Sequence, residues 1–407
     1  MDITKYILAL QHLMAMFGAT VLVPILTGLN PSVALVSAGI GTLIFHYCTS
    51  YKVPVFLGSS FAFIPVIITV KEIYKNDLTY AQGGIVIAGF LYVLFAFFIV
   101  KFGTERTKSF FPAHVTGPMI VVIGLKLVPV ALGMYSQNYI LATTTFTVAI
   151  LINFFARGFL RQLSIIIAVF TGYVLALSMN LVDTSMITNA AFFSLPPFSF
   201  PKFDMGAIII IAPVVIAVFM EHIGDITTNG AVVGADFIKD PGLDKTLMGD
   251  GLATMAAGFI GGPANTTYAE NTGLLAMTKN YNPAILRITA IFAILLGLVS
   301  KFGYIMQSIP APVMGGISLI LFSMISIIGV KTIKNSDSKM NMQNIIVMAT
   351  ILIIGLGSEF IEKKLGFCPG IVVNENIKIT GLSFAAFLGV ALNKAFSSFT
   401  TATVTNS

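Results

Sequence analysis

The sequence predicts an all-α polytopic membrane protein, because it is too apolar to be covered by water. Hydrophobic residues make up 56% of the 407 residues and charged residues only 10%, whereas ordinary soluble domains carry about 25% charged residues. Long apolar stretches recur along the chain, and about 20 such residues are needed to cross a bilayer as a helix. We therefore expect lipid to be the solvent for most of this protein.

Fourteen segments are candidates to span the membrane. The third and tenth are too short or too polar to be plain helices, so we expect broken segments there. Such segments are tolerated at membrane depth only where they line a cavity or are buried in protein. The fourteen ranges are 6–28, 33–50, 55–70, 82–100, 112–133, 138–155, 162–182, 206–224, 246–262, 267–278, 283–304, 310–330, 342–360 and 379–397.

The basic residues of the loops predict the orientation. With the N-terminus inside, about twice as many Lys and Arg fall in the inside loops as in the outside loops. We therefore expect both termini to be cytoplasmic. The polar cap Met1–Lys5 leads directly into a long apolar span, so we expect no removed signal peptide. The net charge of +6 suits cytoplasmic loops beside anionic lipid, and we expect no nucleic-acid partner.

Enzyme chemistry finds little support in the sequence. Cys48 and Cys368 lie far apart and form no metal-type cluster or disulfide framework. The chain has no phosphate-binding Gly-Lys-Ser/Thr loop and no evident nucleophile–base or metal constellation. We expect neither an enzyme nor an ATP-driven pump, and no metal or organic cofactor.

An internal likeness divides the chain into two halves, 1–200 and 201–407. Phe111–Pro118, which opens the fifth span, resembles Ile309–Gly316, which opens the twelfth. The two broken segments are separated by a similar distance. Seven spans per half is an odd number, so the second half enters the membrane upside down. Inverted repeats with paired broken segments are typical of secondary transporters; the alternative is a chance likeness of two Pro-Gly openings.

The polar stretch Gly261–Gly273 belongs to the second broken segment. Its Glu270 and Asn271 need partners or a ligand at membrane depth. A carboxylate and a carboxamide together match a planar ligand with amide-type N–H and C=O edges. Broken backbones would add free N–H groups. Phe61 and Tyr268 are placed to stack on a flat ring, with ordinary packing as the alternative.

Glu221 and Asp225 lie four residues apart, on one face of a helix. Two neighbouring carboxylates in a low-dielectric site cannot both ionise cheaply, so the pair suits proton coupling. The alternative is a solvated helix end at the cytoplasmic boundary. His12, within the first span, is either functional or part of a helix–helix hydrogen bond. Asp250 is a candidate to cap or support the site.

The segment Glu270–Lys279 resembles the signature of the nucleobase–ascorbate transporters, also called the nucleobase–cation symporter-2 family. That pattern is Gln/Glu/Pro, Asn, any residue, Gly, four of any kind, Thr, then Arg/Lys/Gly, and every fixed position matches. The likeness extends to bacterial uracil-type members of the family and covers almost the whole chain. It also includes Gln11–Leu13, Met16–Pro24, Gly58–Phe63, Glu221–Gly224, Asn265–Tyr268 and Pro312–Gly316.

The resemblance implies fourteen segments in two inverted repeats of seven, with short antiparallel strands in the third and tenth. Spans 1–4 and 8–11, about 6–100 and 206–304, would form a core domain. Spans 5–7 and 12–14, about 112–182 and 310–397, would form a gate domain. Family members import nucleobases with protons or sodium, and several are homodimers through the gate domain.

The same resemblance implies roles for individual residues. Glu221 and Glu270 would each accept an N–H from the base, and Glu at 270, where purine-type relatives tend to carry Gln, favours uracil. Asp225 stands where some relatives have a His, and Ala269 replaces a frequent Gly. The implied substrate-binding set is Glu221, Glu270, Phe61, Ala269, Asn271, Ser60 and Tyr268, and the proton-coupling set is Glu221, Asp225, Glu270 and His12.

The expected function is therefore secondary active import of uracil with protons, by alternating access, in the plasma membrane of a bacterium. Sodium is the alternative coupling ion, and xanthine or another purine is the alternative substrate. An anion exchanger or channel of the same architecture is a further alternative. The acids Glu221, Asp225 and Glu270 disfavour it, because they would repel anions.

Overall fold

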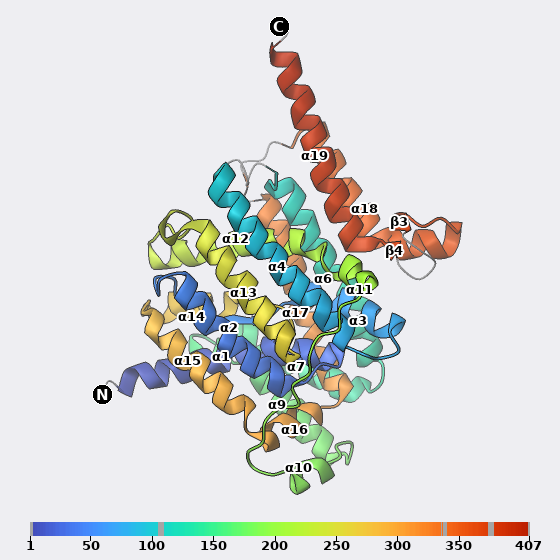
Figure 1. Cartoon of the computed structure of the whole chain (residues 1–407). Helices are drawn as coiled ribbons and strands as arrows, with labels where there is room; N and C mark the ends of the chain where they lie inside the picture. The colour runs from blue at the N-terminus through green and yellow to red at the C-terminus, as the bar shows by residue number, and fades with distance from the viewer. Residues whose placement is uncertain (1–2, 105–109, 335, 337–339, 373–377, 406–407) are drawn as a thin grey trace.

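The computed structural model describes residues 3–104, 110–334, 336, 340–372 and 378–405. These residues are mostly helical and include two small two-stranded sheets. Among them, six helices are long and apolar enough to cross a membrane, and five shorter apolar helices accompany them. The prediction of a helical, multi-pass membrane protein is confirmed at this level (Figure 1).

The first half of the chain contains β1 and four helices of 18 or more residues. Its elements are α1 (Ile3–Thr27), α2 (Pro31–Cys48), β1 (Leu57–Ser59), the 3-10 turn η1 (Phe61–Phe63), α3 (Ile64–Ile73), α4 (Thr79–Phe102), α6 (Ala113–Tyr135), α7 (Tyr139–Phe155), α8 (Phe159–Gln162), α9 (Ser164–Ser178) and α10 (Ser185–Asn189).

The second half contains β2 and a small hairpin near the C-terminus. Its elements are α11 (Met205–Ile211), α12 (Val214–Val233), the turn η2 (Ile238–Gly242), α13 (Leu243–Ile260), β2 (Asn265–Thr267), α14 (Ala269–Thr278), α15 (Pro283–Gly297), α16 (Ser300–Gln307), α17 (Ala311–Lys334), α18 (Met342–Leu365), β3 (Ile371–Val372), β4 (Lys378–Ile379) and α19 (Gly381–Thr405).

The long helices pack into two groups. One is a row in which α4, α13, α2, α15 and α1 contact one another in that order, and the other joins α6, α17, α7, α9, α18 and α19. Each group has a close helix pair built on facing glycines. A Cβ on Gly89 of α4 would lie 2.7 Å from the carbonyl oxygen of Gly251 in α13, and one on Gly329 of α17 would lie 2.7 Å from that of Gly117 in α6. Small residues permit such close approach of membrane helices.

The two predicted broken segments each contain a short strand followed by a helix. β1 and β2 pair antiparallel, with Gly58 opposite Thr266. β1 leads through η1 into α3, and β2 leads into α14. All six strand residues are buried, as non-helical backbone within a membrane protein requires. The short strands expected in the third and tenth segments are confirmed.

Two helices differ from the predicted spans. The eighth was expected to end at 224, but α12 continues to Val233, so Asp225 lies in mid-helix. The polar residues that suggested a helix end instead face a cavity. The eleventh was expected to be one helix, 283–304, but it divides into α15 and α16, with extended backbone at Val299.

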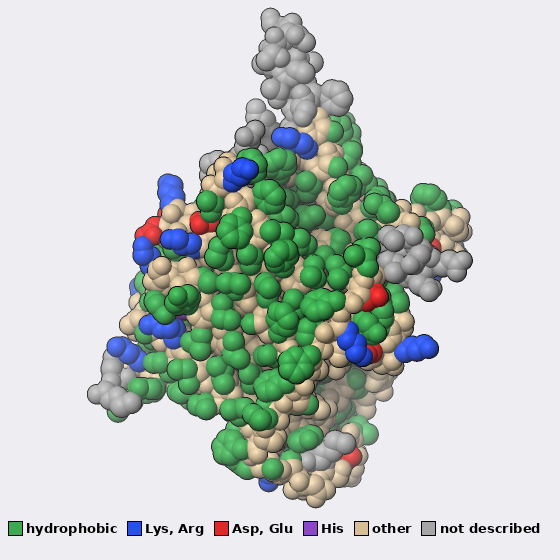
Figure 2. Space-filling model, in the orientation of Figure 1, with side chains coloured by type: hydrophobic (Ala, Val, Ile, Leu, Met, Phe, Trp, Pro, Cys, Tyr) green, Lys and Arg blue, Asp and Glu red, His purple; other side chains and the backbone are tan. Residues whose placement is uncertain are grey.

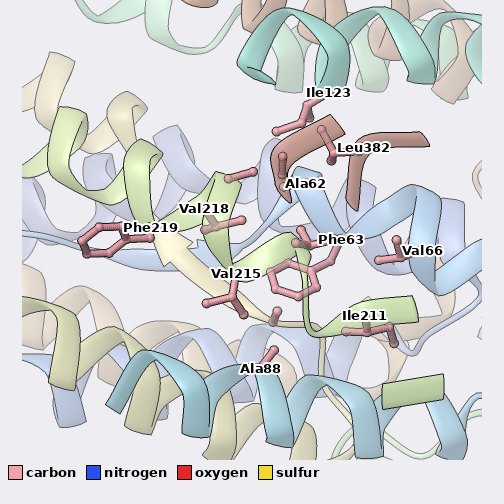
Figure 3. Close-up of a cluster of buried hydrophobic side chains, with 14 of the residues drawn as sticks. Ala62, Phe63, Val66, Ala88, Ile123, Ile211, Val215, Val218, Phe219 and Leu382 are labelled. Atoms are coloured by element: carbon pink, nitrogen blue, oxygen red, sulfur yellow. The ribbon is translucent and has the colours of Figure 1, made fainter. Parts of the chain in front are cut away.

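A hydrophobic cluster fixes the broken segment of the first half against α12. Phe63 packs among Val215, Val218 and Ile211, and Val66 lies beside it (Figure 3). These side chains are fully buried or nearly so. The cluster therefore holds the strand-to-helix junction beside α12, the helix that carries Glu221.

The outer surface is apolar over a broad area. Figure 2 shows hydrophobic side chains covering the middle of one face, with Lys, Arg, Asp and Glu gathered mostly at its left and right margins. Large exposed side chains include Phe97 and Phe98 of α4 and Phe154 of α7. Such a surface suits contact with lipid rather than water.

Candidate functional site

The antiparallel strands bring the N-termini of two helical segments together. η1 begins at Phe61 and α14 begins at Ala269, each directly after its strand region. The backbone N–H of Ser60 donates to the carbonyl of Ala264 over 2.8 Å, and that of Tyr268 donates to the carbonyl of Phe56 over 3.0 Å. Helix N-termini carry unpaired N–H groups and a partial positive charge. Their meeting point is suited to bind carbonyl oxygens or an anion.

Side chains hold this crossing in place. The Tyr268 hydroxyl donates to the carbonyl of Ser59 over 2.9 Å, and the Ser59 hydroxyl donates to the carbonyl of Thr20 in α1 over 2.9 Å. The Asn265 side-chain amide nitrogen donates to the carbonyl of Ser37 in α2 over 3.3 Å. The strands are therefore tied to α1 and α2 through polar groups that are all buried.

A cavity of about 510 Å³ lies beside this crossing. One wall comes from η1, β2, α12 and α14, and the other from α6, α7, α8, α9 and α17. The lining residues are Phe61, Thr116, Ile120, Ala149, Asn153, Arg161, Gln162, Ser164, Ile165, Met220, Glu221, Gly224, Asp225, Thr228, Thr266, Thr267, Tyr268, Ala269, Glu270, Gly273, Ile317, Ile320, Leu321, Met324, Ile325, Ile328 and Thr332.

Three carboxylates line this cavity. Glu221 and Asp225 lie one turn apart on α12, and Glu270 lies in the first turn of α14. Within the described residues, none of the three forms an ion pair with a basic side chain. The first turn of a helix stabilises negative charge, which favours Glu270 as an acceptor. The cavity thus offers strong hydrogen-bond acceptors that the chain itself leaves available.

Aromatic side chains border the same space. Phe61 and Tyr268 both line the cavity, one from each broken segment. The Phe61 ring also packs edge-to-face on Phe322 of α17, with ring centroids 6.4 Å apart. Phe61 therefore joins the first broken segment to α17 at the wall of the cavity.

The structure places six of the predicted site residues on the cavity wall and three behind it. The three are Ser60, Asn271 and His12, which are buried but do not line the cavity. The Asn271 carboxamide nitrogen lies 3.1 Å from His12 Nδ1 and 3.1 Å from the His12 carbonyl oxygen. The six on the wall are Glu221, Asp225, Glu270, Phe61, Ala269 and Tyr268.

A buried polar network stands next to Glu221. His222 Nδ1 lies 2.9 Å from Asp250 Oδ2, and His222 Nε2 lies 3.0 Å from Thr246 Oγ1. All three residues are fully buried between α12 and α13. The expectation that Asp250 supports the site is consistent with this contact, because it fixes the residue adjacent to Glu221.

Several lining residues were not singled out from the sequence. Arg161 was counted as a loop charge, but it lines the cavity and its Nε donates to Asn153 Oδ1 over 3.1 Å. Thr228 and Thr332 also line it, near the ends of α12 and α17. No local pattern marks these residues, because they meet only through the packing of distant helices.

A metal site finds no support in the part of the chain that the structure describes. There, no group of three or more His, Cys, Asp and Glu side chains is arranged to hold a metal ion.

Comparison with known proteins identifies the family. The sequence profile of the permease family matches residues 4–364. The chain belongs to the permease family. This assignment means that the protein is a transporter and not an enzyme, and it confirms the family resemblance inferred from the signature at Glu270–Lys279.

Curated relatives of this permease match over most of their length. The uracil permease of Escherichia coli strain K12 is 39% identical over 403 residues, covering 96% of this chain and 90% of the relative. The uracil permease of Bacillus subtilis is 38% identical over 405 residues, covering 95% and 91%. The probable uracil permease of Haemophilus influenzae is 36% identical over 394 residues, covering 94% and 92%.

Solved structures share the fold of this permease at low sequence identity. The murine solute carrier 26 family member A9 anion transporter, in its inward-facing state, aligns with a TM-score of 0.70 and 10% identity, covering 98% of this chain and 69% of that chain. The transmembrane domain of the cyanobacterial bicarbonate transporter BicA aligns with a TM-score of 0.62 and 14% identity, covering 86% and 94%. These likenesses show the fold alone.

Proposed function

We propose that this permease imports uracil by secondary active transport in the plasma membrane of a bacterium. The observation that carries the proposal is the cavity wall on which Glu221 and Glu270 stand beside two helical N-termini. Relatives with the name uracil permease, at 36–39% identity over nearly the whole chain, support the same substrate.

The proposed recognition follows from the donors and acceptors of uracil. Its ring carries two N–H donors and two C=O acceptors. Glu221 and Glu270 accept from the N–H groups, and backbone N–H groups at Phe61 and Ala269 donate to the carbonyls. A hydrogen bond to a charged group contributes about 1.5–3 kcal/mol. Phe61 and Tyr268 pack against the planar ring, and Asn271 with His12 supports α14 from behind.

Protons are the proposed coupling ion. Three carboxylates in one cavity repel one another, and binding a proton relieves that repulsion. Asp225 extends the acidic set by one helical turn from Glu221. Binding a proton at any one of the three carboxylates therefore changes the proton affinity of the other two. Sodium, which carboxylates also bind, is the alternative, and an imposed gradient distinguishes the two.

The proposed architecture is the one expected from the resemblance: fourteen segments in two inverted repeats, 1–200 and 201–407. Two features support it. β1 and β2 pair antiparallel, and the helices that follow them meet at their N-termini. The row from α1 to α15 corresponds to the core domain and the group around α6 and α17 to the gate domain.

The proposed cycle moves these two groups relative to each other, with the substrate between them. Loop charges favour both termini in the cytoplasm, and with that orientation Arg161 and Thr332 lie at the cytoplasmic end of the cavity. The structure would accordingly represent an inward-facing state. We further propose a homodimer through the gate domain, surrounded by lipid.

Two other functions are compatible with parts of the site. Xanthine or another purine would also use the N–H acceptors, and competition with labelled uracil separates these substrates. Anion transport is suggested by the fold neighbours, one named as an anion transporter and one as a bicarbonate transporter. The three acids on the cavity wall oppose it, because they raise the cost of bringing an anion there.

The decisive experiment is uptake of labelled uracil into proteoliposomes under an imposed proton gradient, with and without sodium. We expect uptake that depends on the proton gradient and is lost in Glu221→Gln and Glu270→Gln. Glu72→Gln, on α3 outside the cavity lining, is the matched control and should transport normally. Normal uptake by correctly inserted Glu270→Gln would overturn the site, and chloride or bicarbonate flux indifferent to uracil would overturn the substrate.

A further inference from the structure

A non-helical segment connects the two halves of the chain. Phe192–Asp204, here called the strap, runs between α10 and α11 without regular secondary structure (Figure 1). It crosses the ends of several membrane helices. Its sequence, FFSLPPFSFPKFD, combines aromatic residues with three prolines.

The backbone of the strap is attached to the helices beneath it. Ser194 N–H donates to the carbonyl of Leu298, just beyond α15, over 3.2 Å. Lys202 N–H donates to the carbonyl of Thr79, at the start of α4, over 3.0 Å. Ser199 N–H lies 3.4 Å from the carbonyl of Ile260, at the end of α13.

Side chains add to these attachments. Gln82 of α4 donates to the Ser199 hydroxyl over 2.7 Å. Lys202 pairs with Asp77 over 2.8 Å, and the Tyr74 hydroxyl donates to the Asp204 carboxylate. Ser199, Lys202 and Asp204 of the strap therefore each pair with a group on the helices or turns beside it.

Prolines remove further backbone donors. Pro196, Pro197 and Pro201 have no N–H group to satisfy. Irregular backbone is costly next to lipid because its polar groups lack partners. The strap reduces that cost both by hydrogen bonding and by proline content.

The outward side of the strap is strongly apolar. Phe200 is 82% exposed, Leu195 78% and Phe193 66%. Phe192, Phe198 and Phe203 are exposed as well.

This apolar side continues onto the neighbouring helices. Exposed Phe90 of α4, Phe259 of α13 and Leu295 of α15 extend it. Figure 2 shows hydrophobic side chains across the face that the strap borders. An exposed apolar patch of this kind marks a site of interaction.

We infer that the strap is a membrane-interface anchor whose outward aromatic side chains contact lipid. Lipid is the occupant because the strap lies at the ends of α4, α13 and α15 and is continuous with their exposed apolar surfaces. Aromatic side chains at the ends of membrane spans settle at the interface between headgroups and acyl chains. The strap thereby holds three helix ends together while facing the bilayer.

The absence of Trp from the chain allows a direct test. Phe200→Trp introduces a single tryptophan, which is reconstituted into vesicles of phosphatidylcholine brominated either near the headgroup or near the chain end. Phe97→Trp, on the exposed side of α4, is the lipid-facing reference. Lys239→Trp, in the turn before α13, is the water-facing reference.

We expect Phe200→Trp to lose most of its emission to bromine near the headgroup and less to bromine near the chain end. Emission quenched by iodide but not by brominated lipid would place the strap in water and overturn the inference. Emission quenched neither by iodide nor by brominated lipid would mean that protein covers the tryptophan, and this result would also overturn the inference. Phe203→Trp repeats the test if Phe200→Trp does not elute as a single species.

Discussion

Asn271 joins the second broken segment to α1 through its carboxamide, which contacts His12. The Asn271 nitrogen lies 3.1 Å from both the ring Nδ1 and the backbone carbonyl of His12. This contact fastens α14 to α1 immediately behind Glu270. The contact gives the two neighbouring residues different roles. Asn271 orients the first turn of α14, and Glu270 lines the cavity.

Removing this carboxamide should destabilise the protein. Asn271→Ala removes the buried hydrogen bonds of the carboxamide to His12, which costs about 1–3 kcal/mol. Unfolding in detergent, compared among Asn271→Ala, His12→Ala and the double variant, measures the coupling. We expect the double variant to lose less than the sum of the single losses, and strict additivity would contradict the contact.

The contact between His222 and Asp250 predicts a larger effect. Asp250→Ala leaves the buried His222 Nδ1 without its carboxylate partner, and a lost hydrogen bond to a charged group costs about 1.5–3 kcal/mol. Asp250→Asn retains an acceptor for the ring and should lose less. The same unfolding measurement compares the free energies of unfolding of the unaltered protein, Asp250→Asn and Asp250→Ala. Equal stability of Asp250→Ala and the unaltered protein would refute the argument.

Gly58 is predicted to tolerate no side chain. A Cβ there would lie 2.4 Å from the Tyr268 ring and 2.9 Å from Thr20 Oγ1. Gly58→Ala should therefore separate β1 from β2 and abolish substrate binding. Gly133→Ala, on α6 with nothing within 4 Å of its Cβ, is the control and should behave normally. Substrate binding and thermal unfolding of both variants provide the measurement.

The ion pair between Asp77 and Lys202 predicts a small dependence of stability on pH. The hydrogen bond from Lys202, and to a lesser degree the one from the Thr79 hydroxyl, lowers the pKa of Asp77 from 3.8 to about 2. A lowered carboxyl pKa contributes stability above pH 3.8 that is lost as pH falls toward about 2. The pair is exposed, so solvent screens it and the effect is modest.

Asp77→Asn tests this dependence through the thermal midpoint in detergent. At neutral pH and low salt the variant should melt slightly below the unaltered protein. That difference should shrink as the pH falls below 3.8, and also in high salt. A difference that is constant with pH would show that charge at Asp77 does not contribute.

Thr332 offers a test of the proposed orientation. It lines the cavity in the last turn of α17. In a background with Cys48 and Cys368 changed to Ser, Thr332→Cys should react with a membrane-impermeant thiol reagent from the cytoplasmic side. Reaction from the outside alone would reverse the orientation. Protection by uracil would in addition link this end of the cavity to the substrate path.

Much of the site was accessible from the sequence because polar groups are costly in lipid. Glu221, Asp225 and Glu270 stood out for that reason, and the structure places all three on one cavity wall. The broken segments were identified in the same way, from shortness and polarity. The end of the eighth span was predicted too early, because residues that face a cavity have the same polarity as residues beyond the membrane.

The sequence by itself determined the membrane class, the broken segments and the family, since each depends on local composition or a short motif. Tertiary structure alone decided the rest. Three features depend on segments far apart in the chain. They are the register of β1 on β2, the hydrogen bond that holds Asn271 against His12 and away from the cavity, and the position of Arg161 on the cavity wall. Hydrophobic patterning specifies that these helices are buried in a bilayer, and packing between them specifies which polar groups meet.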